Sequence, residues 1–212
     1  RQASSGSIQL HGKEQRLSSP QQAIKSGMIL VPDKRMEKGL MMRLDVLENL
    51  SVASLEQHTA LGVVNQKSIL GAAHDAIQRL NIKTPSVSAN IGNLSGGNKQ
   101  KVVFGKWLSA IENVKDQVFL FDEPTEGIDV GARAEMWNII RDLAQQGAGV
   151  IVASSDLEEL MALGDRLCIM RDGRVVQTGH RTAYTHDRVL HLMISSAEGQ
   201  ANAAPVPQME SK

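Results

Sequence analysis

The sequence predicts an α/β domain, because short apolar runs alternate with longer segments of helical periodicity. Three apolar runs have the length of buried strands and are bounded by glycine, proline or polar residues: residues 28–32, 118–121 and 150–153. The second run is apolar throughout, which is typical of the centre of a parallel sheet with helices on both faces. We therefore expect parallel strands in a sheet that helices cover.

Helices are predicted between these strands. Residues 44–81 have a helical pattern, and one apolar stripe in it recurs at three- and four-residue steps: Ile69, Ala73, Ala76, Ile77 and Leu80. A second helix is predicted from about Ala132 to Gln146, where Gly147 provides a natural end. Its expected buried face consists of five residues: Ala132, Met136, Ile139, Ile140 and Leu143.

Shorter elements complete the prediction. The charged residues 33–38 are expected to form a loop, and residues 157–163 a short helix. Asp172-Gly173 is a strong hairpin signal between two apolar segments. The single cysteine, Cys168, lies in an apolar run and is expected to be a buried small hydrophobe.

The bulk composition excludes some functions. The 212 residues carry 23 basic and 23 acidic side chains, so the formal net charge is zero. General affinity for nucleic acid is therefore not indicated. No run of eighteen apolar residues and no signal-peptide pattern occurs in the sequence. The chain opens on Arg1, and we expect it to be part of a longer polypeptide.

Two carboxylates follow the apolar run at 118–121. Asp122 and Glu123 stand where the strand ends, and ligands of open α/β sheets bind beyond the carboxyl ends of the strands. One interpretation assigns Asp122 to a magnesium ion and Glu123 to the orientation and deprotonation of a water that attacks a phosphoryl group. The alternative is that both acids cap the next turn, and the pair alone does not decide between the two.

A second feature is the turn Ser95-Gly96-Gly97 before a helical pattern in which Val102, Val103, Trp107 and Leu108 face inward. Two glycines at a helix start expose backbone N–H groups, and the helix dipole favours an anion there. This is a phosphate-recognition geometry. The alternative is a plain serine N-cap before an amphipathic helix.

Together the motifs are specific. Leu94–Gln100 resembles the signature motif of ABC ATPases, and Val118–Glu123 resembles their Walker B strand with the catalytic glutamate after the aspartate. Gly127-Ile128-Asp129 is similar to their D-loop. Order and spacing along the chain match as well, over about residues 7–193.

A narrower resemblance is to the carboxyl-terminal ATPase half of bacterial ribose/arabinose/galactose importers. It rests on Asn98, Asp122–Ala132 and Ala153–Asp156, with further matches at Val31–Asp33 and Leu80–Pro85. In that family one polypeptide carries two ATPase halves in tandem. It lies on the cytoplasmic face of the inner membrane, binds two membrane permease subunits and receives sugar from a periplasmic binding protein.

The resemblance implies a P-loop NTPase (RecA-like) core with a helical subdomain, the amino-terminal part of the core being absent from this chain. Residues 1–39 and 91–195 would form the core, and residues 40–90 the helical subdomain that faces the membrane subunits together with the loop at 33–39. Residues 196–212 are rich in Ala, Gln, Pro and Ser and are expected to be a disordered tail.

The resemblance also implies the ligands and residue roles. ATP and Mg²⁺ are the expected ligands, with Glu123 catalytic and Asp122 at the metal, both acting on ATP that this half binds. Asp129 would belong to the D-loop, and Ser155 would occupy the switch position. The signature residues would act on ATP held by the partner half: Leu94, Ser95, Gly96, Gly97, Asn98 and Gln100.

The sequence departs from the ABC pattern in several places. No GxxGxGK[ST] phosphate loop occurs in it, so that loop is expected upstream of Arg1, and this chain alone is expected to be inactive. Ser155 stands where most ABC ATPases have a histidine, whose charged contact a serine does not offer. Glu126 replaces the usual arginine of the subfamily, and Lys99 replaces a frequent glutamine. Both are expected to be solvated surface residues. The loop around Asp33 lacks a Q-loop glutamine.

Three functions compete at this point. The leading hypothesis is ATP hydrolysis coupled to sugar import. The second is a regulatory half that hydrolyses nothing and presents its signature to a partner ATPase, which Ser155 and the missing phosphate loop favour. The third is an ABC ATPase of translation or DNA repair, against which the zero net charge argues. The sugar itself is not predicted, because its specificity lies in other subunits.

Overall fold

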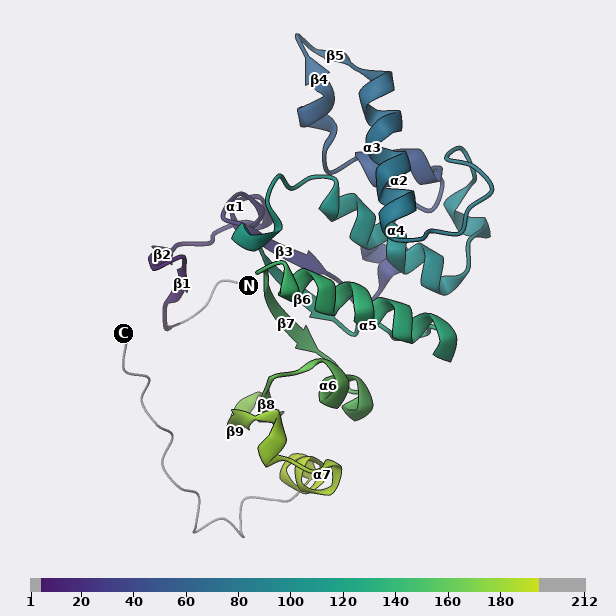
Figure 1. Ribbon diagram of the computed structural model, residues 1–212. Coiled ribbons are helices and arrows are strands. Elements are labelled where there is room, and N and C mark those ends of the chain that lie inside the picture. Colours follow the sequence, from purple (N-terminus) through teal and green to yellow (C-terminus); the bar gives the residue numbers. More distant parts are fainter. Residues whose placement is uncertain (1–4, 195–212) are drawn as a thin grey trace. The chain divides into compact units, whose positions relative to one another are not determined.

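The computed structural model describes residues 5–194 (Figure 1). The predicted disordered tail therefore lies outside the described residues. The chain forms two compact units, Arg1–Ser155 and Asp156–Lys212.

The first unit contains both strands and helices. Its strands are β1 (Ile8–Leu10), β2 (Lys13–Gln15), β3 (Met28–Val31), β4 (Thr59–Ala60), β5 (Val63–Val64), β6 (Val118–Asp122) and β7 (Gly149–Ala153). Its α-helices are α1 (Pro20–Lys25), α2 (Val46–Ser51), α3 (Gln66–Arg79), α4 (Gly96–Leu108) and α5 (Val130–Gln145). One π-helical turn (Arg35–Gly39) and three 3₁₀ turns (Leu55–His58, Ile91–Asn93 and Val114–Asp116) complete it.

The three predicted strands are confirmed and form one parallel sheet in the order β3-β6-β7. Their register places Leu30 beside Leu120, and Leu120 beside Ile151. Because side chains of a strand alternate between faces, the neighbours of these residues lie on the opposite face. That opposite face holds the core of the unit, with Phe119 and Phe121 buried at its centre.

The prediction that helices cover both faces of the sheet is wrong for the described residues. Leu30 is 53% exposed and Ile151 is 59% exposed, and Leu120 between them is only partly buried. A run that is apolar throughout does not tell which of its faces is covered, because the covering element comes from elsewhere in the chain. The sheet therefore has one packed face and one open apolar face.

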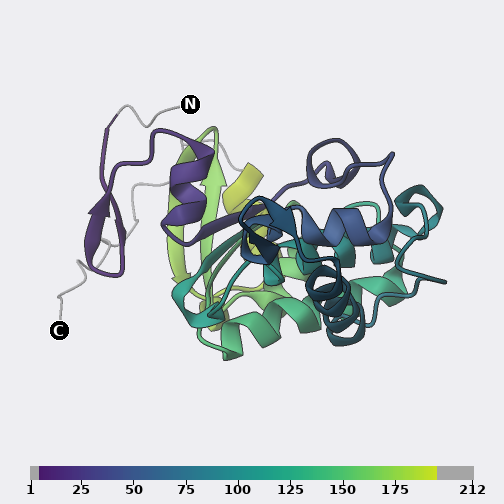
Figure 2. The same cartoon turned by 90° about the horizontal axis from the view of Figure 1, so that it is seen from above.

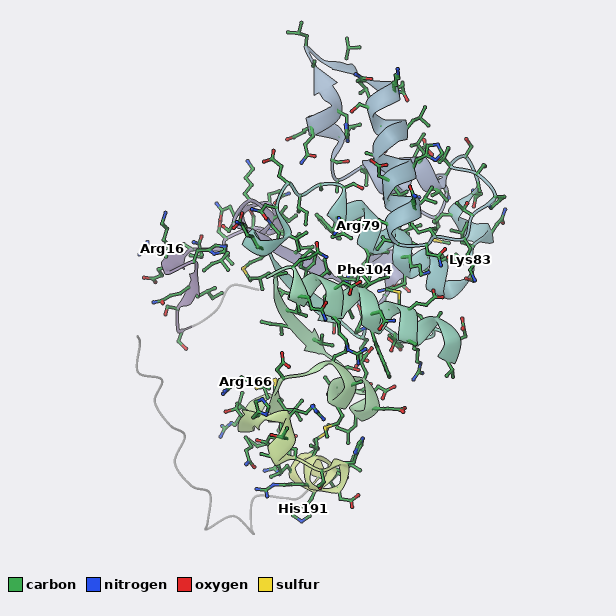
Figure 3. All side chains as sticks on the ribbon, viewed as in Figure 1. Arg16, Arg79, Lys83, Phe104, Arg166 and His191 are labelled. Carbon is green, nitrogen blue, oxygen red and sulfur yellow. The ribbon has the colours of Figure 1, made fainter. Side chains whose placement is uncertain are left out.

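Two helices cover the packed face, α4 against β3 and α5 against β7 (Figures 1 and 2). Phe104 of α4 stacks on Phe121 with ring centroids 5.0 Å apart, and Figure 3 shows Phe104 where α4 meets the sheet. Val102 and Val103 are buried as predicted, whereas Trp107 and Leu108 are only partly buried.

Helix α5 begins at Val130 and ends at Gln145, close to the predicted bounds. Its buried residues are Met136, Ile140 and Leu143, while Ala132 and Ile139 of the predicted face are partly buried. The Asp129 side chain caps its start by accepting a hydrogen bond from the N–H of Ala132 over 3.0 Å. This cap begins the helix two residues earlier than the apolar pattern indicated.

The prediction of helix throughout residues 44–81 is wrong in the middle of that region. Helices α2 and α3 are present, but the hairpin β4–β5 separates them. Leu61 and Gly62 both have positive φ, 53° and 78°, as a tight two-residue hairpin turn requires. The β-branched pair Val63–Val64 then favours a strand over a helix.

The segment predicted as a loop at 33–38 contains the π-helical turn Arg35–Gly39. The N–H of Lys38 donates to the carbonyl of Lys34 over 2.8 Å, and its ammonium group pairs with Asp33 at 2.7 Å. Charged side chains at this spacing close the turn on itself, which composition alone does not reveal.

The second unit contains α6 (Leu157–Leu163), β8 (Arg166–Arg171), β9 (Arg174–His180) and α7 (His186–Ile194), with a 3₁₀ turn at Arg181–Ala183. The predicted helix and hairpin are confirmed, and Asp172 and Gly173 have the positive φ values of its turn. Its core consists of Leu167, Ile169, Tyr184, Val189 and Leu192.

The predicted burial of Cys168 is wrong, because this residue is exposed. Leu167 and Ile169 on either side of it face the core of the unit, and strand alternation turns the side chain between them outward. Among residues 5–194, no helix has the length and apolar character needed to cross a membrane.

Candidate functional site

The two carboxylates after the central strand lie at the carboxyl end of β6, as predicted. Asp122 is its last residue, and Glu123 follows with φ of +48°, a left-handed conformation that costs about 1–2 kcal/mol for a residue other than glycine. The N–H of Glu123 donates to the carbonyl of Ala153 over 2.8 Å. This bond extends the pairing of β6 with β7 by one residue and fixes the strained backbone.

The Glu123 carboxylate is held by the residues that follow β7. Its Oε1 accepts a hydrogen bond from the backbone N–H of Ser155 over 2.7 Å, and its Oε2 accepts one from the Ser154 hydroxyl over 3.3 Å. The structure therefore brings Glu123 and Ser155 together, although 32 positions separate them in the sequence. Ser155 contributes its backbone amide to this contact, and its residue is exposed.

An ion pair of Lys38 with Asp33 follows β3, and its lysine interacts with the charge of Asp122. The hydrogen bond with Asp33 raises the pKa of Lys38, and the Asp122 charge adds a smaller increase. The same hydrogen bond lowers the pKa of Asp33. A cation therefore lies near Asp122 at the carboxyl edge of the sheet, and sequence reasoning did not assign this lysine to the site.

The residues at this edge fit a nucleotide-bound magnesium ion better than a metal held by protein alone. No group of three or more His, Cys, Asp or Glu among residues 5–194 could hold a metal ion. Mg²⁺ commonly takes one or two carboxylates and completes its shell with phosphate oxygens and waters. A single partly buried carboxylate such as Asp122 suits that arrangement.

The predicted phosphate-recognition turn forms the start of α4. Ser95 is the N-cap, exposed, and its Oγ accepts a hydrogen bond from the N–H of Asn98. Both interpretations of the sequence describe this geometry, because a serine N-cap and an accessible helix start occur together. The two ends of the motif point inward, since Leu94 is 7% exposed and Gln100 is 1% exposed.

Gly97 is buried, so its lack of a side chain serves packing. A Cβ added there would lie 2.7 Å from Cβ of Ala132 and 3.7 Å from Cγ2 of Ile128. The start of α4 thus lies directly against the turn that contains Asp129 and begins α5. The structure brings the predicted signature and D-loop residues side by side at one end of the packed helices.

Glu126 and Lys99 were both predicted to be solvated surface residues, but their exposure differs. Glu126 is exposed, as expected, whereas Lys99 is partly buried on α4. Gln100, predicted to contact a ligand, is enclosed, and within the described part of the chain its Oε1 has no hydrogen-bond partner. The motif did not indicate the burial of Gln100, because that burial depends on which face of α4 packs against the rest of the unit.

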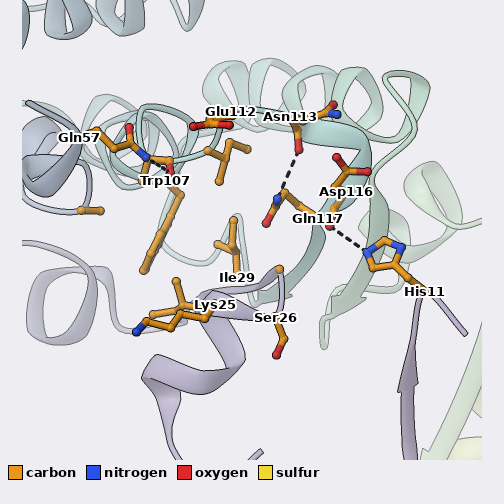
Figure 4. A pocket seen from close by; sticks show the side chains of 15 residues that line it. His11, Lys25, Ser26, Ile29, Gln57, Trp107, Glu112, Asn113, Asp116 and Gln117 are labelled. Atoms are coloured by element: carbon orange, nitrogen blue, oxygen red, sulfur yellow. Dashed lines mark hydrogen bonds between the residues drawn. The ribbon is translucent and has the colours of Figure 1, made fainter. Parts of the chain in front are cut away.

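The cavity in Figure 4 lies elsewhere. It has a volume of about 520 Å³ and is lined by residues at the amino ends of β3 and β6, such as Gly27 and Gln117, and by Trp107 of α4. None of the predicted site residues lines it. Ligands of α/β sheets bind at the carboxyl ends of the strands, so this cavity is not the candidate site.

Comparison with solved structures gives the class of fold. A nucleotide-free ATP-binding cassette from an ABC transporter superposes with a TM-score of 0.69 at 18% identity, over 85% of this chain and 71% of that one. A dimeric cassette in a post-hydrolysis state, bound to ADP and Pi, gives 0.68 at 17% identity, over 85% and 75%. The chain therefore has the fold of an ABC ATP-binding cassette, which confirms the predicted fold class. No family model matches it.

Curated relatives narrow the assignment. An arabinose import ATP-binding protein of Mannheimia succiniciproducens is 41% identical over 89% of this chain and 37% of its own length. An arabinose import ATP-binding protein of Pseudomonas syringae pv. syringae is 39% identical, and a ribose import ATP-binding protein of Yersinia pestis 32% identical, each over 93% of this chain and 38% of its own length. The chain is thus a homologue of sugar-import ATP-binding proteins, as the motifs indicated. It spans little more than a third of the length of these relatives.

Proposed function

We propose that this chain is part of an ATP-binding and ATP-hydrolysing subunit of an ABC importer that takes up a monosaccharide. The observation that carries the proposal is the end of β6, where Glu123 is fixed beside the end of β7, together with homology to sugar-import ATP-binding proteins along nine-tenths of the chain. A carboxylate that a strand end orients is suited to position a water for attack on a phosphoryl group.

The proposal assigns the two groups of residues to two different ATP molecules. Asp122 and Glu123 would act on ATP bound by this half, whose phosphate loop is not in the 212 residues. Ser95 and the helix dipole of α4 would act on ATP bound by a second ATPase half. We place that half in the same polypeptide, upstream, which is compatible with the greater length of the relatives.

When bound, Mg²⁺ would neutralise the charge that develops on the phosphates, and Asp122 would hold it. The role of Glu123 is to accept a proton from water. The bonds that Ser154 and Ser155 donate orient the carboxylate, and each of its oxygens keeps a second lone pair for a water.

The partners follow from the same proposal. Two membrane permease subunits would bind the helical region 40–90 and the turn at 33–39, and a periplasmic protein would deliver the sugar. The polypeptide would then lie on the cytoplasmic face of the bacterial inner membrane as a peripheral protein. The neutral net charge supports the absence of a nucleic-acid partner.

A second candidate function is a regulatory half that binds ATP without hydrolysing it. Ser155 favours it, because this serine stands where most ABC ATPases have a histidine and contacts Oε1 of Glu123 through its backbone amide. A serine side chain does not offer the charged contact of an imidazole.

The variant E123Q in the complete polypeptide separates the two functions. If this half hydrolyses ATP, the neutral amide cannot accept the proton, so turnover and sugar uptake should fall by about 10²-fold or more while ATP binding persists. The control E14Q makes the same change at an exposed residue of β2, outside the predicted site, and should leave ATP binding and turnover close to those of the unmodified protein. Unchanged turnover and uptake in E123Q would refute hydrolysis by this half and establish the regulatory function.

A further inference from the structure

The hydroxyl of Ser95 at the start of α4 has both of its acceptor positions engaged by one residue. Asn98 donates to Ser95 Oγ from its backbone N–H over 3.4 Å and from its side-chain Nδ2 over 2.9 Å. A serine hydroxyl has two lone pairs and one proton. With both lone pairs accepting, the proton is left to be donated.

The orientation of the Asn98 amide is decided by a third residue. Its Oδ1 accepts a hydrogen bond from the backbone N–H of Lys83 over 2.8 Å. A backbone N–H can only donate, so it selects the carbonyl oxygen of the amide and leaves the NH₂ group toward Ser95. The reversed amide would place two donors face to face at Lys83, which disfavours it.

The two residues before Lys83 (labelled in Figure 3) are held in place by hydrogen bonds. The N–H of Ile82 donates to the carbonyl of Ile77 over 2.9 Å, and the carbonyl of Asn81 accepts a hydrogen bond from Lys101 over 2.9 Å. The Lys101 ammonium is buried and also pairs with Glu135 of α5 at 2.6 Å. The linker after α3 is therefore tied to α4 and α5.

We propose that Asn98 is a positioning residue that commits the Ser95 hydroxyl to donate a hydrogen bond to a phosphate oxygen of ATP. Ser95 is exposed, and within residues 5–194 its hydroxyl donates to no protein acceptor. Asn98 has a positioning role because its Oδ1 accepts from Lys83 while its Nδ2 donates to Ser95. This inference rests on the proposed function of the α4 start.

The variant N98D inverts the arrangement with minimal change of shape. One carboxylate oxygen still accepts from the N–H of Lys83, but the other can only accept, so the Ser95 hydroxyl turns to donate to it. The Ser95 hydroxyl then no longer donates its proton to the phosphate, and one of its lone pairs faces the phosphate. In the variant N98A both side-chain bonds are lost, yet the hydroxyl stays free to donate.

The experiment measures ATP turnover by the complete polypeptide carrying S95A, N98A, N98D or S95A/N98D, with a melting temperature for each. We expect S95A and N98D each to lose roughly tenfold or more, the value of a hydrogen bond to a charged group, and N98A to lose less than N98D. A purely structural role gives the opposite order, because N98D keeps the Lys83 bond that N98A lacks. The double variant S95A/N98D carries the added charge but has no Ser95 hydroxyl to redirect. We therefore expect N98D to lower ATP turnover by a much smaller factor when Ser95 is already alanine.

The outcomes separate the inference from the proposed function. If S95A retains full turnover, the Ser95 hydroxyl is not a ligand donor, and both the inference and the role proposed for the start of α4 are overturned, whereas hydrolysis by this half is decided by E123Q. If S95A is impaired but N98D is not, or if N98D costs the same factor with and without S95A, the proposed function stands and the positioning role of Asn98 is overturned.

Discussion

Replacement of Gly97 by alanine tests the contact between the start of α4 and the start of α5. The added Cβ would lie 2.7 Å from Cβ of Ala132, whereas ordinary contacts begin at 3.4 Å. Cβ of Ala132 is attached directly to the backbone and has no rotamer to escape into, so the helices themselves must move apart. Overpacking of this kind costs typically 1–3 kcal/mol, and the helix propensity gained by replacing glycine offsets about 0.5–1 kcal/mol. We expect a net loss of about 1–2 kcal/mol in the free energy of unfolding.

The assay is urea unfolding of the chain, followed by the fluorescence of Trp107 and Trp137, which lie in the two helices concerned. The variants are G97A, A132G and G97A/A132G. In the double variant the offending methyl group of residue 132 is gone, so the added methyl at position 97 should be accommodated. We expect it to be more stable than the sum of the single changes predicts, by about 1–2 kcal/mol.

Two results would contradict this reasoning. If G97A is as stable as the unmodified chain, the starts of the two helices do not touch. If the effects of the two substitutions add without coupling, Gly97 and Ala132 are not partners, and the signature and D-loop residues do not form one packed corner of the site.

Two further predictions concern stability. In G105A the added methyl would lie 2.6 Å from the side chain of Leu50 in α2, which is 1% exposed, so we expect the free energy of unfolding to fall by about 1–3 kcal/mol. In G71A of α3 the methyl meets nothing within 4 Å, so the free energy of unfolding should rise by up to about 1 kcal/mol. Urea unfolding of both variants measures whether each change lowers or raises stability. The hydrogen bond from Lys101 lowers the pKa of Glu135 from 4.5, so its stabilisation is present above about pH 4.5 and is lost as the pH falls through the lowered value. Unfolding curves of E135Q and the unmodified chain should therefore converge in acid, and a constant difference down to pH 3 would refute the assignment.

The candidate site was predictable where its chemistry is local. Asp122 and Glu123 end an apolar strand, and the Ser-Gly-Gly turn begins a helix, so both could be assigned from neighbouring residues alone. The contact between Glu123 and Ser155 could not, since it depends on the parallel pairing of β6 with β7. The bond between Lys83 and Asn98 was equally inaccessible, because it joins a linker to a helix through a backbone N–H that carries no sequence signal.

The sequence by itself determined the strands β3, β6 and β7, the hairpin β8–β9, the helices α4 and α5, and the family resemblance, because apolar periodicity, caps and motif residues act over a few positions. It also determined the zero net charge and the absence of a phosphate loop from the 212 residues. Only the tertiary structure decided which face of the sheet is packed, why Gly97 must be glycine, and how Ser95 and Glu123 are oriented. These are matters of contact between elements distant in the chain, where the partner of a side chain is set by how the sheet and helices pack.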